Sequence, residues 1–120
     1  MARLQKRSFA NADDVRQLGH GRFDVVNLDE TAIGRIRMEP GWRWSTDAKP
    51  KVGTASCQVR HLGAAVAGTL HIRADDGLEL ELHAGDAYEI PPGHDAWVVG
   101  DEAVIGFEFD SRTAEEYAKG

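Results

Sequence analysis

Short apolar runs that alternate with polar residues recur along most of this chain. In the stretch 69–74, three apolar residues fall on one side, whereas His71 and Arg73 fall on the other. The stretch 78–82 repeats the pattern with a leucine at every second position. Successive residues of a β-strand point to opposite faces of a sheet, so a period of two with one apolar face is typical of a half-buried antiparallel strand.

The same alternation occurs near the end of the chain. There Ile105, Phe107 and Phe109 share one face, and Glu108 lies on the opposite face. This pattern predicts a strand that turns its three apolar side chains toward the core.

Glycines punctuate these runs throughout the chain, which favours many short strands joined by turns. The triplet 75–77, Asp-Asp-Gly, is a strong hairpin signal because glycine readily adopts the positive φ of a tight turn. We expect strands at 23–28, 33–38, 56–66, 69–74, 78–82, 87–90, 97–99 and 104–109. Acidic residues early in 11–18 and a capping box in 111–119 predict a short helix near each end.

Composition narrows the classes of partner. With 14 basic and 20 acidic residues the formal net charge is −6, which disfavours nucleic acid as a partner. Cys57 is the sole cysteine, so the chain forms no internal disulfide. The first thirty residues lack the apolar core of a signal peptide, and no apolar run reaches the length of a membrane span. We therefore expect a cytoplasmic protein with no membrane partner.

The most specific motif is the segment 85–97, GDAYEIPPGHDAW. It fits the pattern G-x5-P-x-G-x2-H, except that Ala96 stands where the pattern has histidine and His94 lies two positions earlier. With similar runs at 39–44, 56–61 and 90–102, the chain resembles short single-domain bacterial cupins without an assigned activity. The resemblance implies an all-β, RmlC-like fold, a double-stranded β-helix or jelly-roll barrel over about 34–109, within one domain spanning 1–120 and ending in short terminal helices.

The resemblance also shows what is altered at the family's metal site. The first cupin signature, G-x5-H-x-H-x3,4-E-x6-G, places Asp47 and Lys49 at its two histidines and His61 at its glutamate. Eleven residues separate Lys49 from His61, so an insertion is expected there. With Ala96 at the fourth position, the standard site of three histidines and one glutamate is absent.

A rebuilt metal site is one interpretation of the remaining polar residues. Alternation from Cys57 to His61 places both on one strand face, His94 follows the prolines near the barrel mouth, and Asp47 supplies an oxygen. One cysteine, two histidines and one aspartate would suit a divalent metal such as zinc. The alternative is structural: Cys57 as a small buried apolar residue and His61 as a hydrogen-bonded core histidine.

A ligand pocket is the second interpretation. Trp42, Trp44 and Trp97 could wall it together with His61 and His94, because ligand sites are mostly apolar with a few placed polar groups. Large aromatic residues also serve cores and subunit contacts. Trp42 and Trp44 fall on one predicted strand face, which suggests a homodimer interface.

Three functions fit these residues. The first is a non-enzymatic barrel that binds or senses a small molecule and works as a homodimer. The second is a metal-dependent enzyme, a dioxygenase or isomerase of a small polar metabolite, which needs His61 to share one ion with Cys57, Asp47 or His94. The third is a metal-free enzyme with His61 as the catalytic general base. Fold alone does not choose among them.

Overall fold

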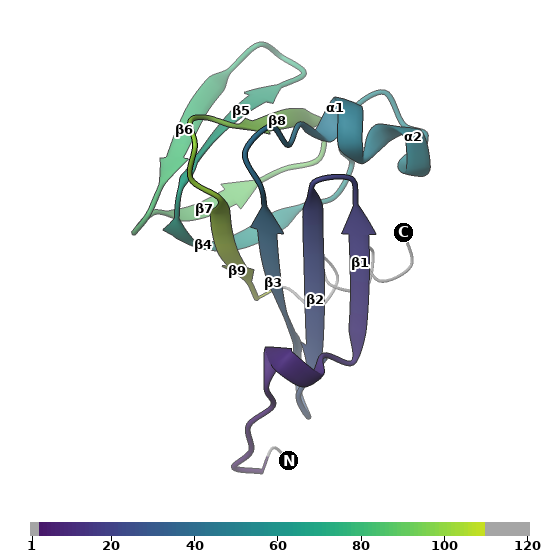
Figure 1. The fold of residues 1–120 in the computed structure, drawn as a ribbon, viewed down its shortest axis with the longest axis vertical. Coiled ribbons are helices and arrows are strands. Elements are labelled where there is room, and N and C mark those ends of the chain that lie inside the picture. The colour runs from purple at the N-terminus through teal and green to yellow at the C-terminus, as the bar shows by residue number, and fades with distance from the viewer. Residues whose placement is uncertain (1–2, 110–120) are drawn as a thin grey trace.

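The chain forms two antiparallel β-sheets, which confirms the all-β prediction. The computed structural model describes residues 3–109 (Figure 1). The larger sheet has the strand order β1 (Asp14–Leu18), β2 (Gly21–Asn27), β3 (Ala32–Met38), β9 (Val104–Glu108), β4 (His61–Ala67) and β7 (Ala87–Ile90). The smaller sheet has the order β6 (Glu79–His83), β5 (Thr69–Ala74) and β8 (His94–Val98). The helix predicted at 111–119 lies outside the described residues.

The helix predicted at 11–18 is wrong. A short 3-10 helix, η1 (Phe9–Asn11), leads instead into strand β1. β1 pairs with β2 along its whole length, and Leu18 lies opposite Gly21 across a two-residue turn. Gly19 occupies this turn with a φ of 59°, a conformation that glycine adopts without strain. Pairing with β2 therefore outweighs the local helical signals.

Two predicted strands begin at other residues. β4 starts at His61 rather than at residue 56, and Cys57 is joined to the sheet by one isolated bridge to His94. β8 starts at His94, three residues before the predicted strand at 97–99. Both shifts place a histidine at the first position of a strand. These residues, His61 and His94, both lie close to Cys57.

Two short helices occupy the expected insertion between Lys49 and His61 and the residues just before it. These are α1 (Trp44–Asp47) and α2 (Lys49–Val52); Figure 1 shows α1 beside β8, with α2 on the other side of α1. Neither these nor any other helix within residues 3–109 is long and apolar enough to cross a membrane. Because Trp44 begins a helix, the prediction that Trp42 and Trp44 share a strand face is wrong. Both side chains are buried within the chain, so they do not offer a surface for a dimer.

Strand β9 also faces the opposite way from the prediction. Val104, Gly106 and Glu108 are its buried positions, whereas Ile105 and Phe107 are half-buried on the other face. Phe107 packs against Phe9 of η1, with ring centroids 5.6 Å apart. The outer face of this central strand is thus partly covered, which leaves the inner face free to present a carboxylate to the interior.

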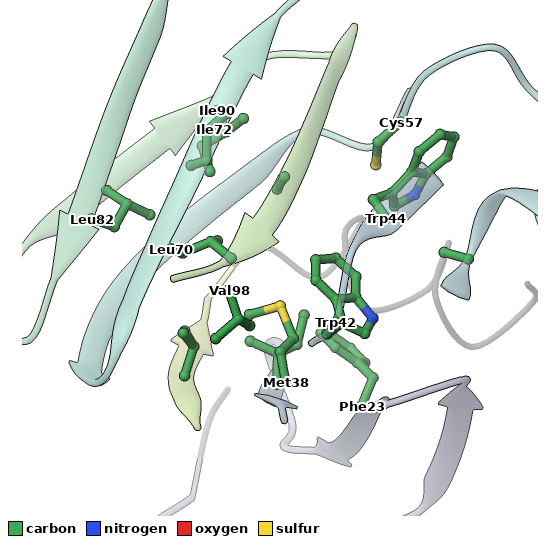
Figure 2. Packing of buried hydrophobic residues seen from close by; sticks show 14 of the residues in the cluster. Phe23, Met38, Trp42, Trp44, Cys57, Leu70, Ile72, Leu82, Ile90 and Val98 are labelled. Atoms are coloured by element: carbon green, nitrogen blue, oxygen red, sulfur yellow. The ribbon is translucent and has the colours of Figure 1, made fainter. Parts of the chain in front are cut away.

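The core fills the space between the inner faces of the two sheets. Figure 2 shows Leu70 and Ile72 of β5 and Leu82 of β6 on one side, with Met38 of β3 and Trp42 toward the other. Trp44 lies beside Cys57 at the edge of this cluster. Apolar packing therefore surrounds the point at which the cysteine and the histidines meet.

Candidate functional site

Cys57, His61 and His94 meet inside the barrel, as the sequence suggested. The Cys57 N–H donates to the His94 carbonyl at 2.7 Å, and the Gly93 N–H donates to the Cys57 carbonyl at 2.7 Å. This bridge sets the start of β8 against the segment before β4. The first residue of β4, His61, lies on the same inner side.

The side-chain donors of the three residues are close together. The Cys57 Sγ lies 3.7 Å from His61 Nε2, and the donor atoms of the three residues all lie within 4.8 Å of one another. The two imidazole rings stand edge to face with centroids 5.2 Å apart. All three residues are at most 5% exposed. This is the one group of three such potential metal ligands among the residues that the structure describes.

Each histidine is held by its other ring nitrogen. His61 Nδ1 lies 2.9 Å from Oε1 of Glu108, and His94 Nδ1 lies 2.9 Å from the Pro91 carbonyl oxygen. A carboxylate and a carbonyl accept hydrogen bonds, so each Nδ1 carries the proton that it donates. The Nε2 atoms of both rings are thereby directed to Cys57 as potential ligands.

Glu108 is the functional residue that sequence reasoning missed. It is buried at 3% exposure, and it also accepts a hydrogen bond from the Tyr88 hydroxyl at 2.9 Å. Gly63 lies between the two residues in the sheet, paired with Tyr88 on one side and with Glu108 on the other. Because Gly63 has no side chain, the tyrosine reaches across β4 to the carboxylate. A glycine within the predicted strand was the available signal.

These contacts change the acidity of the site. Burial raises the pKa of the Cys57 thiol, but the hydrogen bonds with His61 and His94 more than offset it and lower the pKa to about 6. Burial lowers the pKa of His61, whereas the adjacent Glu108 carboxylate and the hydrogen bond with Cys57 raise it to about 10. Burial, followed by the charge of Glu108, raises the pKa of Tyr88 and keeps its hydroxyl protonated. A thiolate beside an imidazolium results near neutral pH.

The cluster borders a small cavity in the barrel. Its volume is about 40 Å³, and its lining includes Trp42, Trp44, Ala96 and the three cluster residues. Trp42, Trp44, His61 and His94 of the predicted ligand pocket thus surround one space. That space also includes Ala96, the position at which the cupin pattern has a histidine.

Two predicted site residues lie elsewhere. Trp97 is on the outer face of β8, stacked on His71 at 4.7 Å between ring centroids, with the Arg43 guanidinium 4.2 Å from the Trp97 ring. Asp47 accepts hydrogen bonds from the backbone N–H groups of His20 and Arg43. Trp97 does not line the cavity, and Asp47 is not in the cluster.

Several solved structures are similar to this chain. A scan against protein-family models finds no match, and a search of curated proteins finds none. A protein of unknown function from Rhizobium leguminosarum has a TM-score of 0.61 and 21% identity, over 90% of this chain and 97% of that one.

Two further structures are named as cupins. The Cnp3 cupin domain of Schizosaccharomyces pombe has a TM-score of 0.58 and 16% identity, over 98% of this chain and 82% of that one. A sugar phosphate isomerase of the cupin superfamily from Silicibacter pomeroyi has the same TM-score and identity, over 88% and 74%. At such identities the likeness concerns the fold alone. This chain therefore has the cupin fold, as its resemblance implied.

Proposed function

We propose that this protein is a non-enzymatic barrel that binds a small ligand at a divalent metal ion, zinc, held by Cys57, His61 and His94. The observation that carries the proposal is the convergence of one sulfur and two imidazole nitrogens within 4.8 Å at a buried point. Three protein ligands leave one position of a tetrahedral zinc ion for a small molecule or anion.

The distances support zinc. Bonds of about 2.3 Å to sulfur and about 2.0 Å to nitrogen, at a tetrahedral angle, separate the two ligand atoms by roughly 3.5 Å. The distance from Cys57 Sγ to His61 Nε2 is 3.7 Å. The site therefore requires little movement of these two residues to accept the ion.

The hydrogen bonds that hold the two histidine rings also support zinc binding. Histidines that bind metals generally donate their other N–H to a carboxylate or a backbone carbonyl, which fixes the tautomer and the ring. His61 does so to Glu108, and His94 to Pro91. A cysteine with a pKa of about 6 is already largely deprotonated at pH 7, and the thiolate is the form that binds metals. His61, whose pKa is raised to about 10, must release its Nε2 proton when the ion binds.

Cavity size favours binding over catalysis on a metabolite. A volume of about 40 Å³ holds roughly three water molecules, at 10–15 Å³ each. Pockets for organic ligands usually measure about 300–1,000 Å³.

The linked pairs Cys57–His61 and His61–Glu108 also resemble the nucleophile, base and orienting acid of a catalytic triad. Cys57 is only 2% exposed, however, and the cavity is too small for most substrates.

Metal analysis tests the proposal directly. Protein purified without a histidine tag should contain close to one zinc ion per chain by elemental analysis. After the zinc is removed with a chelator, added cobalt(II) should give the visible absorption of a tetrahedral site, together with a thiolate-to-metal charge-transfer band. Cys57→Ser should abolish that band, because the band requires the sulfur ligand.

His94→Gln should weaken zinc binding, whereas His83→Gln is the matched control because His83 is an exposed histidine outside the cluster. If neither zinc nor cobalt binds to the purified, folded protein, the proposal is wrong. Binding that is equally strong in Cys57→Ser would place the ion elsewhere. The homodimer and the cytoplasmic location remain predictions, which sedimentation and cell fractionation would test.

A further inference from the structure

A second, larger hollow lies outside the barrel interior. It has a volume of about 380 Å³ and runs between the β5–β6 hairpin and the segment from β7 to the start of β8. The groove shares only Ile90 and His94 with the lining of the barrel cavity. Its volume falls within the range of about 300–1,000 Å³ that organic ligands usually occupy.

Leucines of strand β6 and the turn before it form much of one wall. Leu78 and Leu80 line the groove at 68% and 47% exposure, and Leu82, the next residue on the same face, is 7% exposed and lines the barrel cavity instead. The hairpin thus extends its inner face beyond the cover of the larger sheet (Figure 1). Ile90 and the prolines of the Pro91–Pro92 turn also line the groove. The groove is therefore mostly apolar.

The charged residues that line the groove are all of one sign. Asp75, Asp76 and Glu89 contribute carboxylates, and no lysine or arginine is among the lining residues. Within residues 3–109 each carboxylate has one polar contact: Asp75 with the Ser56 hydroxyl at 2.8 Å, Asp76 with a backbone N–H at 2.9 Å, and Glu89 with Arg60 at 2.9 Å. A carboxylate accepts up to about four hydrogen bonds, so capacity for a further donor remains.

We infer that this groove binds a small organic cation, an ammonium group carried on an alkyl or aryl body. The leucine and proline walls suit the apolar body, and the carboxylates suit the ammonium group. His94 is the one proposed zinc ligand in the lining of the groove, whereas Cys57 and His61 do not line it, so most of this site lies apart from the metal.

A second copy of this chain fits the groove less well. A two-fold interface would bring the same surface of each copy together. The carboxylates of Asp75, Asp76 and Glu89 would then face their own copies, and like charges across an interface are costly. The formal charge of −6 on each chain adds to this repulsion.

Titration with three probes of similar size tests the charge and the place of binding. Full-length protein in chelator is titrated with 2-phenylethylammonium, 2-phenylethanol and 3-phenylpropionate, and the methyl NMR signals of Leu78 and Leu80 are followed. We expect saturable shifts with the cation, weaker ones with the alcohol and none with the anion. Repeating the titration with zinc-loaded protein should give the same order.

Charge-neutral variants complete the test. The double change Asp76→Asn with Glu89→Gln should weaken binding of the cation about threefold or more, since each exposed charge contributes modestly. Glu102→Gln, an exposed carboxylate outside the groove, should leave it unchanged. Leu80→Ser should also weaken binding, through loss of apolar contact.

Several results would overturn the inference. They are equal binding of the anion, no shift at Leu78 or Leu80, or an unchanged affinity in the double variant. Dimerisation that protects these leucines and excludes the cation would assign the groove to a second copy instead. Failure of zinc to bind would leave these outcomes unaffected, so the two proposals fail separately.

Discussion

His61 donates its Nδ1 proton to Glu108 across 2.9 Å, and both side chains are buried. The two residues are 47 positions apart in the sequence and are brought together by strands β4 and β9, which pair in the sheet. The same carboxylate accepts the Tyr88 hydroxyl. Glu108 therefore fixes the ring of one proposed metal ligand while remaining outside the ligand set.

Replacing Glu108 by glutamine should weaken zinc binding. The variant retains an oxygen acceptor but loses the charge that stabilises a proton on Nδ1. Changes to such supporting residues typically reduce metal affinity about 10- to 100-fold. Competition with a chromophoric chelator measures this change, and circular dichroism checks the fold.

Glu89→Gln is the control for this experiment, because Glu89 is an exposed carboxylate on the neighbouring strand β7. It should bind zinc as tightly as the original protein. Equal affinity in Glu108→Gln would show that the carboxylate does not support the metal site.

The Cys57 thiol should ionise well below its ordinary pKa in metal-free protein. Hydrogen bonds with His61 and His94 outweigh the effect of burial and lower the pKa to about 6. Thiolate absorption in the ultraviolet should therefore rise with a midpoint near pH 6, and His61→Gln should move the midpoint upward. A midpoint near 9 in the original protein would contradict the contact with the histidines.

The same pair predicts an unusual dependence of stability on pH. The pKa of Cys57 falls from 9.0 to about 6 on folding, so its contribution is complete above 9 and is lost as the pH falls toward 6. The pKa of His61 rises from 6.5 to about 10, so its contribution is complete below 6.5 and is lost as the pH rises toward 10. Between 6.5 and 9 the two slopes oppose each other.

The free energy of unfolding of metal-free protein should consequently change little between pH 6.5 and 9. In Cys57→Ser only the His61 contribution remains, held by Glu108, so stability should fall as the pH rises through this window. Urea unfolding at several pH values measures both proteins. Parallel pH profiles of the two proteins would mean that Cys57 and His61 do not form a thiolate–imidazolium pair in the folded state.

Structural features that depend on neighbouring residues could be predicted from the sequence, whereas those that depend on contacts between distant segments could not. Alternation and turn residues are local signals, and they were enough for the strands at 69–74 and 87–90. The error at 11–18 arose because pairing with β2, a contact between segments, outweighed local helix signals. The family resemblance supplied the barrel, which no local pattern defines.

The site was predictable only in part for the same reason. Cys57 and His61 could be placed together because they are near in sequence, and the motif placed His94 near the mouth. Glu108 was assigned to the wrong face because the apolar residues of β9 were expected to point inward. Phe9 packs on the outer face instead, against Phe107, and the sequence of the strand alone does not predict this contact. Trp97 was misplaced because aromatic character alone does not tell an inner from an outer face.

The position of Trp97 leads to a prediction about the two tryptophans. Trp44 is 3% exposed and lines the barrel cavity, so Trp44→Ala should cost about 3–5 kcal/mol of stability and disturb zinc binding. Trp97→Ala should cost less and leave zinc affinity unchanged, because its contacts are with His71 and Arg43 on the outer face. Thermal unfolding and chelator competition measure both effects, and a loss of zinc affinity in Trp97→Ala would place this residue in the site after all.

Gly63→Ala should separate Tyr88 from Glu108. A Cβ atom at this position would lie 2.2 Å from the Phe107 carbonyl oxygen and 2.9 Å from the Tyr88 hydroxyl. The backbone of β9 and the tyrosine must both shift, and overpacking of this kind costs about 1–3 kcal/mol. We expect a lower urea midpoint and an increase in the rate of amide exchange where β4 pairs with β9. Gly77→Ala is the contrasting control, because its Cβ would meet nothing within 4 Å and only the positive φ of 93° is strained.

Tyr88→Phe in the Gly63→Ala background should then cost less stability than Tyr88→Phe alone, since the hydrogen bond from Tyr88 to Glu108 is already lost. Equal costs in the two backgrounds would show that Gly63 does not hold the path from Tyr88 to Glu108 open.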